Sequence, residues 1–573
     1  MRKYSLAKDI AIETSGIDPK KPPKSAIVVG GDAFAQLGAE QKKIYDADMK
    51  ALAKKPGVAI RAFGGSIYIY APADYNYAGA VRGLAFGLYE LLENNTDLIF
   101  FDRVVKVGGY MPVYGPNRIF EPSATGDFDL VWGDGFVHAP PVPESSMSGL
   151  GQNRSPGYNW VGDWQFGRRR TRSTNHWWGY GTDPLPGEDK EKIKEETWGR
   201  RADGTLMVPG CYTGHPCLVR VLDRAREAYL HSSGFRPFTD GSFAETQAPG
   251  KAFAWNSYDV NGLWVEDSIS MCQCEKCLTP IRLANGSTVG PDSPYFRSTQ
   301  FYSNGSAMIN AVNVYAKRDA RVESIGYFWM APVPLMTVSR NYVVRFCPYI
   351  RKNYFVPIFA PMNDMHWRAM NAWGQQGIHL SLYEYFLCIG LRPFADIAAW
   401  DFDAEVELGG FDEWMAETEH SALARLERWT MERMLWGAQG KDIPKLRAYY
   451  LARTYREAAE PMARFFSLVM GLTESKLRFA SPMEFEDDQI VYRNAMRTKA
   501  EGLFAGTVAD EMEKCLVEAE KAVKNPFAAQ ALKEFREEWD KYKADAIANE
   551  AKWLEDLKGG AASKAMKVVG APE

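Results

Sequence analysis

The sequence has no long hydrophobic run and no basic stripe. None of its apolar segments approaches the roughly 18–20 residues that cross a bilayer, so we expect no membrane span. The 573 residues carry a formal net charge of −4, and without a basic patch we expect no nucleic-acid partner. The short basic run at residues 168–172 lies among aromatic residues and is more typical of a solvated or substrate-facing loop.

Disulfide frameworks, phosphate-binding motifs and leader segments are also missing. Eight cysteines are too few for a disulfide scaffold in a chain of this length. No GxGxxG or GxxxxGKS/T motif follows an expected strand, which disfavours a nucleotide-binding fold. The first ten residues, MRKYSLAKDI, do not continue into the apolar segment of a signal peptide. From the residues alone, a cytoplasmic protein and a mature exported chain both stay open.

Aromatic residues are abundant by contrast. The chain has 17 Trp, 28 Tyr and 30 Phe, and many of the Trp and Tyr residues lie in stretches rich in Gly and Pro. Aromatic rings bury large areas in a core, but in loops they also stack on flat apolar surfaces. The C–H faces of a pyranose ring are such surfaces. This composition therefore favours a protein that binds sugars.

The order of apolar segments predicts an α/β protein with three parts: a small N-terminal α/β domain, a central barrel and a C-terminal helical domain. In the first part, residues 1–118, the segments SAIVVGG and SIYIYAP are typical of strands. The segment GAEQKKIYDADMKALAKK between them is typical of a helix. Residues 422–573 are almost continuously helical in pattern, which predicts a helical bundle.

The central part, residues 119–421, alternates expected strands with helices. Strands are expected in KAFAWNSYDV, SIGYFWMAP, NYVVRFC and GIHLSLYEYF, and a helix is expected in RSTQFYSNGSAMINAVNVYAKR. Alternation over about 300 residues is typical of a (β/α)8 barrel of the TIM type. A doubly wound parallel sheet is the alternative.

Catalytic groups of a barrel project from the carboxyl ends of its strands, and several acids lie at such expected ends. The catalytic candidates among them are Glu266, Asp267, Glu384 and Glu417. Glycoside hydrolysis needs a carboxylic acid to protonate the leaving oxygen and a second group at the anomeric carbon. Aromatic neighbours would desolvate Glu384 and raise its pKa, which suits an acid. Each position also has an ordinary interpretation. Glu384 could pair with a buried arginine, Glu417 could lie at a helix start, and Asp267 could be a turn residue.

A second set of residues could bind the sugar. They are aromatic, histidine or acidic residues in loop-like sequence or at expected strand ends, where they could stack on a ring or hydrogen-bond to hydroxyl groups. The candidates are His176, Trp177, Trp178, Trp255, Asp259, Tyr327, Trp329, His366, Trp367 and Tyr383.

The segment CQCEKC places Cys272, Cys274 and Cys277 within six residues. Structural zinc needs four ligands, and the fourth could come from GCYTGHPC, which contains Cys211, His215 and Cys217. A disulfide between two of the cysteines and free buried thiols are the alternatives. A catalytic thiolate has the least support. We expect the cysteines to stiffen a loop, with a structural zinc ion as one means, and we expect the reaction to need no cofactor.

Several of these motifs resemble a known bacterial family. The segments IVVGG, SIYIY and YAGAVRGLAFGLYELLENN are similar to the small α/β domain that precedes the barrel in family 20 hexosaminidases and in α-glucuronidases. The motifs CQCEKC, SIGYFWMAPVP, HLSLYEYF and TYREAAEPM resemble the family first catalogued as domain of unknown function 4838. Part of that family became glycoside hydrolase family 163, endo-β-N-acetylglucosaminidases acting on complex N-glycans.

The resemblance implies an exported enzyme, secreted, periplasmic or on the cell surface, with a (β/α)8 barrel. Family 20 and its relatives use the 2-acetamido oxygen of the substrate as nucleophile, with an Asp that orients it and a Glu that acts as acid. The pair here, Glu266 and Asp267, stands in the reverse order.

The leading hypothesis is a retaining glycoside hydrolase of the endo-β-N-acetylglucosaminidase type, with a glycan as its partner. Glu384 or Glu417 would be the acid/base, and Glu266 or Asp267 would orient or stabilise the reacting sugar. One alternative is a hydrolase of another polysaccharide, such as one containing uronic acid or a plant or algal polymer. A non-catalytic glycan-binding protein with a degenerate barrel and a metalloenzyme built on the cysteines are two others. The sequence makes no prediction about oligomeric state.

Overall fold

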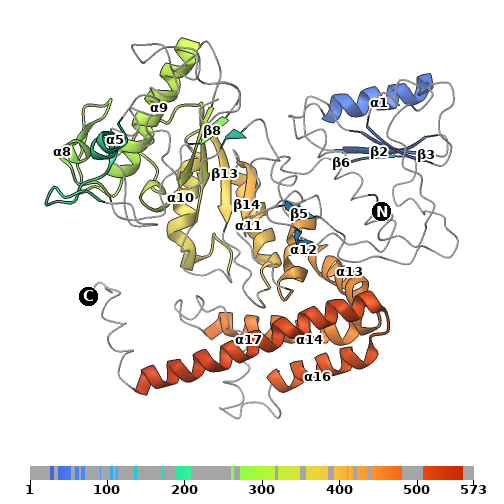
Figure 1. The fold of residues 1–573 in the computed structure, drawn as a ribbon. Coiled ribbons are helices and arrows are strands. Elements are labelled where there is room, and N and C mark those ends of the chain that lie inside the picture. The colour runs from blue at the N-terminus through green and yellow to red at the C-terminus, as the bar shows by residue number, and fades with distance from the viewer. Residues whose placement is uncertain are drawn as a thin grey trace.

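A computed structural model defines the fold (Figure 1). It is a mixed α/β protein with two separate larger sheets and a C-terminal set of helices. The described residues are 26–30, 37–52, 58–63, 66–70, 91, 104–107, 111–113, 135–138, 171–172, 189–207, 260–262, 271–316, 321–348, 356–384, 391, 393–408, 411–416, 422–435, 442–479 and 508–558.

The N-terminal sheet has four strands in the order β1-β3-β2-β6, and helix α1 lies over one of its faces (Figure 1). Strand β1 pairs with β3 in parallel, whereas β2 pairs with β3 and with β6 in antiparallel fashion. The predictions of strands in SAIVVGG and SIYIYAP and of a helix between them are confirmed. The elements are β1 (Ile27–Val29), α1 (Ala39–Leu52), β2 (Val58–Phe63), β3 (Ser66–Tyr70) and β6 (Gly135–His138).

A buried ionic contact fastens α1 to this sheet. Asp48 of α1 accepts two hydrogen bonds from the guanidinium group of Arg61 in β2, at 2.8 and 2.7 Å, and a third from the hydroxyl group of Tyr70 in β3. Burial, followed by the contact with Asp48, raises the pKa of Tyr70 well above its usual value. The tyrosine therefore stays neutral and can donate to the carboxylate.

In the described ranges the central sheet contains six strands, all parallel, and their spatial order follows their order in the chain. Three crossovers pass through the helices α9, α10 and α11, which lie beside the sheet in Figure 1. The strands are β7 (Thr171–Arg172), β8 (Val260–Gly262), β11 (Arg321–Gly326), β12 (Tyr342–Phe346), β13 (His379–Glu384) and β14 (Phe411–Ala416), and the helices are α9 (Phe296–Ala316), α10 (Asp364–Gly374) and α11 (Ala395–Leu408).

This strand order decides which face the crossover helices cover. Crossovers between parallel strands are right-handed in nearly all proteins, so steps that always move in one direction place their helices on one face. A doubly wound sheet instead reverses its order at a switch point, and these six strands contain no reversal. The α/β class is confirmed. Within the described residues the outer strands β7 and β14 do not pair with each other, so a closed eight-stranded barrel is not shown.

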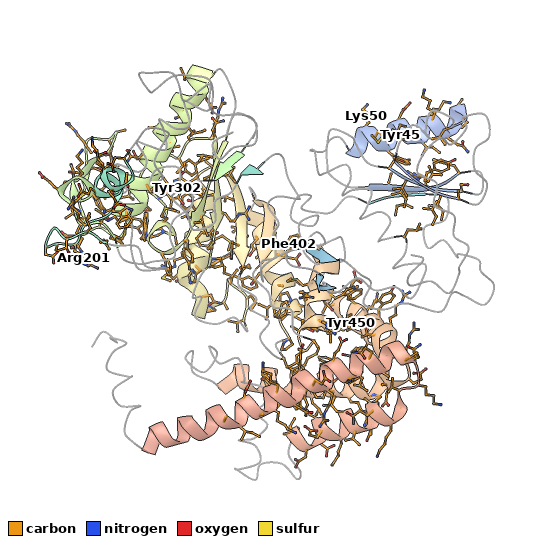
Figure 2. The ribbon with its side chains drawn as sticks, in the orientation of Figure 1. Tyr45, Lys50, Arg201, Tyr302, Phe402 and Tyr450 are labelled. Carbon is orange, nitrogen blue, oxygen red and sulfur yellow. The ribbon has the colours of Figure 1, made fainter. Side chains whose placement is uncertain are left out.

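Aromatic side chains fill the layer between the sheet and its helices. Tyr302 of α9, which Figure 2 labels, is one of them. It packs edge-on against Tyr342 of β12 and Trp373 of α10, with ring centroids 5.4 and 4.9 Å apart. The indole N–H of Trp373 donates to the carbonyl oxygen of Ala331 at 2.9 Å. Burial raises the pKa of both tyrosines, so their hydroxyl groups are neutral parts of the core.

The C-terminal part consists of helices in the described ranges, as the sequence predicts from residue 422 onward (Figure 1). In its core, the ring of Phe465 in α14 packs edge-to-face against two rings of α17, with centroids 5.3 Å from Phe535 and 5.2 Å from Trp539. The helices are α12 (Arg425–Leu435), α13 (Ile443–Tyr455), α14 (Ala459–Phe479), α16 (Val508–Ala522) and α17 (Pro526–Lys558), with a 3-10 turn at Arg456–Ala458.

One buried arginine joins α12 and α13 to α11, a crossover helix of the central sheet. Arg447 of α13 donates to both carboxylate oxygens of Glu427 in α12 and to Asp396 in α11, each at 2.7 Å. Glu427 also accepts the backbone N–H of Ala395, the first residue of α11, at 2.9 Å. A single network therefore fixes three helices at one point.

Shorter elements complete the described structure. Strands β4 (Val104–Val107) and β5 (Met111–Val113) form a separate antiparallel pair. Strands β9 (Ile281–Arg282) and β10 (Thr288–Val289) form a small hairpin beside α9. The other short elements are α5 (Lys190–Thr197), α8 (Glu275–Leu278) and the 3-10 helices at Phe328–Met330 and Pro361–Asn363.

Candidate active site and candidate metal centre

Strand register divides the central sheet into two faces. A Cβ atom added at Gly305 of α9 would lie 2.6 Å from the hydroxyl oxygen of Tyr342, so Tyr342 points toward the helices. Because side chains alternate along a strand, Val344 and Phe346 share this side, which we term the helix face. Val343 and Arg345 belong to the opposite side, which we term the inner face.

The same alternation carries over to β13. Phe346 pairs with Leu382, so Leu382 and then Glu384 have the parity of the helix face. Arg345 pairs with Ser381, so Tyr383 has the parity of the inner face. Glu384 and Arg345 are both 0 % exposed, and Tyr383 is 1 % exposed. The two candidates at the end of β13 are Tyr383 and Glu384. Tyr383 is therefore the one that lies on the same face of the sheet as Arg345.

The end of β11 departs from its prediction. The segment SIGYFWMAP was expected to be one strand, but β11 ends at Gly326 and residues Phe328–Met330 form a 3-10 helix. Phe328 has a φ of 46°, which is unusual for a residue with a side chain and marks local strain. Such strain is often found at functional sites, and here it lies at the carboxyl end of a central strand.

The two candidates in this turn are packed rather than open. Tyr327 is buried, with its ring centroid 4.0 Å from that of Phe328. Trp329 is partly buried and packs edge-on against Phe301 of α9, with centroids 6.0 Å apart. Trp329 therefore packs against a crossover helix, and Tyr327 belongs to the same buried core.

His366 and Trp367 lie in the first turn of α10. His366 is buried, and Trp367 is partly exposed with its ring 6.0 Å from that of Phe359. Because α10 follows β12 and returns to the start of β13, its first turn lies toward the carboxyl edge of the sheet. Trp367 and the exposed Phe359 thus form an aromatic pair toward the carboxyl edge of the sheet.

The remaining predicted site residues lie outside the described residues. Among the acids these are Glu266, Asp267, Asp259 and Glu417. The others are His176, Trp177, Trp178 and Trp255, and the same holds for the three predicted alternatives for a fourth metal ligand, Cys211, His215 and Cys217.

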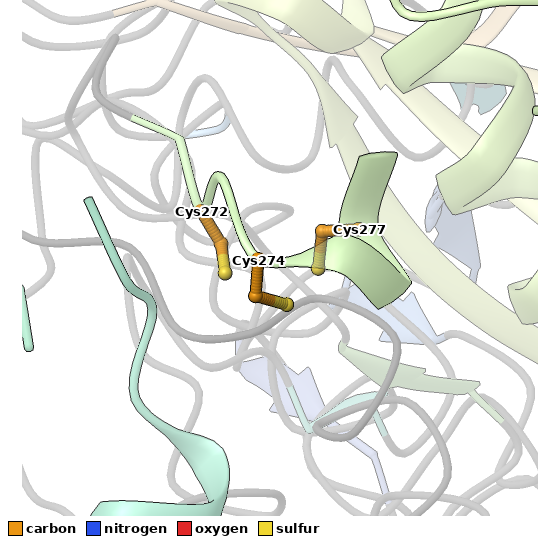
Figure 3. Close-up of side chains that lie close together, drawn as sticks. All are labelled: Cys272, Cys274 and Cys277. Atoms are coloured by element: carbon orange, nitrogen blue, oxygen red, sulfur yellow. The ribbon is translucent and has the colours of Figure 1, made fainter. Parts of the chain in front are cut away.

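The cysteine motif forms a compact cluster (Figure 3). The Sγ atoms of Cys272, Cys274 and Cys277 all lie within 4.8 Å of one another, and the three side chains extend into one space. In the described structure none of the three is part of a disulfide. Cys272 and Cys277 are buried and belong to the same core as the central sheet, whereas Cys274 is partly exposed. This group could bind a metal ion.

The local fold explains why the sulfur atoms meet. Cys274 precedes the single turn of α8, and the N–H of Leu278 donates to the carbonyl oxygen of Cys274 at 3.0 Å. Residues three apart on a helical turn lie on one side, which brings Cys277 back over Cys274. Cys272 approaches from the extended segment before the turn.

Two arginines from elsewhere in the chain hold this loop. The backbone N–H of Arg200 donates to the Sγ atom of Cys272 at 3.3 Å, and Gln273 returns a backbone hydrogen bond to Arg200 at 2.7 Å. The guanidinium group of Arg297 in α9 donates to the carbonyl oxygens of Cys277 and Cys272, at 2.7 and 2.9 Å. Burial lowers the pKa of Arg297, and the three neighbouring cysteines oppose that shift.

Sequence reasoning missed Arg345, Arg297 and Phe328. A charged residue inside the apolar strand segment NYVVRFC is a signal that could have drawn attention to Arg345. The positive φ of Phe328 and the contacts of Arg297 with the cysteine loop depend on tertiary packing. No sequence pattern therefore predicts them.

Comparisons with known proteins do not assign a family. No protein-family model matches the chain, and no curated protein matches it. One similar solved structure is a family GH138 enzyme targeting pectin rhamnogalacturonan II; it is 9% identical, covers 91% of this chain and 86% of its own, and has a TM-score of 0.34. A TM-score of this size carries no weight for fold or function. The resemblance to domain of unknown function 4838 and family 163 therefore stays a prediction. No described helix is long and apolar enough to cross a membrane.

Proposed function

We propose that this protein is a glycoside hydrolase that acts on glycans. One observation carries the proposal: buried polar side chains line the inner face of a one-directional parallel sheet near its carboxyl edge. Arg345 and Tyr383 are both buried there, on the side that right-handed crossovers leave without helices. In barrel enzymes this is the position from which catalytic residues project.

A buried inner face also supports closure of the sheet into a barrel. Val343, Arg345 and Tyr383 are at most 5 % exposed, and in the described chain the crossover helices belong to the other face. We propose that further strands of the chain cover this face and complete a (β/α)8 barrel.

Of the two candidate acids, we propose Glu417 rather than Glu384 as acid/base. Glu384 has the parity of Leu382 on the helix face, so its burial suits the structural ion pair that the sequence left open. Glu417 directly follows the last residue of β14. The Cα register pairs Tyr383 with Met415, and β14 ends at Ala416. We propose that the strand extends by one residue, which would give Glu417 the parity of Met415 and Tyr383. Glu266 or Asp267 would orient or stabilise the reacting sugar.

The finer substrate assignment follows the sequence resemblance. We propose an exported, retaining endo-β-N-acetylglucosaminidase, with Trp367 and the predicted tryptophans as stacking surfaces for sugar rings. Carboxylate catalysis of this kind needs no cofactor. We therefore give the cysteine cluster a structural part in the enzyme and no part in its reaction.

The test is a mass-spectrometric screen of products released from complex N-glycoproteins, mucin glycans and plant or algal polysaccharides. Release of an N-glycan ending in one reducing N-acetylglucosamine would support the endo-hexosaminidase assignment. Another released sugar would keep the hydrolase and discard that substrate. Binding without any product would favour the second candidate, a non-catalytic glycan-binding protein.

Three matched variants then separate the acids. Glu417→Gln should lower turnover by about 10²–10⁴-fold, the usual contribution of a general acid. Glu384→Gln should act mainly on stability. Glu407→Gln, an exposed acid of α11, serves as the control and should leave both unchanged. Full activity of Glu417→Gln would remove Glu417 from the mechanism.

A further inference from the structure

We propose that Cys272, Cys274 and Cys277 bind one zinc ion through their thiolates, with a water molecule as the neutral fourth ligand, and that this ion fixes the connection between β8 and α9 to residues 198–207. The proposal goes beyond the hydrolase assignment, because it concerns three thiols to which that assignment gives no part in the reaction. It stands on sulfur geometry, on charge and on the contacts around the loop.

The distances suit a shared metal ion. Tetrahedral zinc with Zn–S bonds of about 2.3 Å holds its sulfur ligands about 3.8 Å apart. The three Sγ atoms already lie within 4.8 Å of one another, so small side-chain rotations would bring them to that spacing (Figure 3). A disulfide would unite only two of the three sulfurs, at about 2.0 Å, and would leave the third without a role.

The surroundings balance the charge of such a site. Three thiolates and one Zn²⁺ ion carry a net charge of −1. The guanidinium group of Arg297 carries the compensating positive charge, and it bonds to the carbonyl oxygens of both outer cysteines, Cys272 and Cys277. A buried charge is tolerated when it is paired and hydrogen-bonded in this way.

In metal sites, hydrogen bonds from surrounding groups orient the residues that bind the metal, and the cysteine loop receives such bonds. The backbone N–H of Arg200 donates to the Sγ atom of Cys272, a bond that spans 72 residues of sequence. Gln300 of α9 adds a side-chain hydrogen bond to the carbonyl oxygen of Cys277 at 3.3 Å. Thiolate ligands favour zinc, Cu(I) and iron–sulfur clusters. Of these, zinc is the one without redox chemistry.

The ion would hold the cysteine loop in a fixed conformation and so fix its contact with residues 198–207. Strand β8 ends at Gly262 and α9 begins at Phe296, so a long connection leaves the carboxyl edge of the sheet between them. The cysteine loop, the β9–β10 hairpin and the start of α9 belong to this connection. Residues 198–207 meet it through Arg200. The predicted acids Glu266 and Asp267 precede Cys272 in the same connection.

The first experiment measures zinc in the intact protein, purified under reducing conditions. We expect one zinc ion per chain. Replacement of zinc by Cd²⁺ should give the ultraviolet sulfur-to-cadmium charge-transfer band, with an intensity that corresponds to at least three thiolates. The bound metal should also protect three cysteines from alkylation, and a chelator should abolish that protection.

Matched variants locate the site. Cys274→Ser, chosen because Cys274 is the partly exposed ligand, should lower zinc affinity at least tenfold and weaken the cadmium band. Cys515→Ser changes a buried thiol of α16 far along the chain and should retain both. If Cys274→Ser does not fold, the measurements on the unchanged protein still decide.

Two results would overturn the proposal. One is a reduced, folded protein that holds no zinc and whose cysteines remain open to alkylation when zinc is added. The other is a disulfide among the three cysteines, seen in a non-reducing digest as a mass two hydrogens lower for the peptide that contains them. Neither result depends on glycan cleavage, so failure of the zinc site and failure of the hydrolase assignment are distinguishable.

Discussion

Gly305 of α9 and Tyr342 of β12 fit so closely that a Cβ atom at position 305 would lie 2.6 Å from the tyrosine hydroxyl oxygen and 2.9 Å from its Cε2 atom. Both residues lie within the layer that joins the first crossover helix to the sheet. The absence of a side chain at position 305 is therefore what lets α9 approach the strand. This contact identifies the side of β12 that carries Tyr342 as the helix face.

Gly305→Ala should destabilise the protein by roughly 1–3 kcal/mol, the usual cost of overpacking a core. In an open helix the same change would stabilise by about 1 kcal/mol, because alanine has the higher helix propensity. Gly471→Ala in α14 is the matched control, since a Cβ atom there would meet nothing within 4 Å. Denaturant unfolding checks both. Adding Tyr342→Phe should recover part of the loss, and equal stability of the two alanine variants would contradict the close fit.

Arg447→Met should destabilise the protein by about 3–5 kcal/mol, because it leaves Glu427 buried without its guanidinium partner. The loss should be seen in denaturant unfolding at neutral pH. Arg368→Met removes an ion pair with Asp364 in which the arginine side chain is 79% exposed, and it should change the stability by less than about 1 kcal/mol. Similar losses for the two variants would argue against a network that fixes α11, α12 and α13.

Glu513 gives a prediction about pH. Burial raises the pKa of its carboxyl group, but hydrogen bonds from Lys543 and Trp539 and the charge of Arg536 outweigh this and lower it. A carboxylate with a lowered pKa contributes stability above its unfolded pKa and loses it as the pH falls through the folded value. Glu513→Gln should therefore be less stable than the unchanged protein near pH 6, by roughly 1 kcal/mol. The difference should shrink in unfolding measurements at about pH 3, below the unfolded pKa of a glutamate.

The control for this prediction is Glu537→Gln, which removes an exposed carboxylate 3.9 Å from Lys533. It should change the stability little at either pH. A difference between the unchanged protein and Glu513→Gln that stays constant from pH 6 to pH 3 would contradict the proposed electrostatic origin.

Arg297→Lys should weaken zinc binding by about 10- to 100-fold, the usual effect of losing a group that orients metal ligands. A lysine keeps the positive charge but cannot span the carbonyl oxygens of Cys272 and Cys277 with one planar fork. Competition with a chromophoric chelator measures the change. Unaltered affinity would mean that charge alone, without the two hydrogen bonds, supports the site.

The sequence by itself determined the elements whose patterns are local. The apolar periodicity of residues 422–479 predicted helices, and α12, α13 and α14 are found there. The segments NYVVRFC and GIHLSLYEYF predicted strands, and these are β12 and β13. The spacing of Cys272, Cys274 and Cys277 likewise brings their sulfur atoms together within one turn of chain. In each case the deciding interactions lie within a few residues.

Tertiary structure alone decided which face each strand residue occupies. The sequence marked Glu384 as a strand-end acid, but its parity follows from pairing between β12 and β13, and a shift of one residue would exchange the faces. The contact between Gly305 and Tyr342 then assigns those faces to helix and interior. Arg200 and Arg297 reach the cysteine loop only because distant segments pack there. Long-range register and packing set these relationships, and no local pattern encodes them.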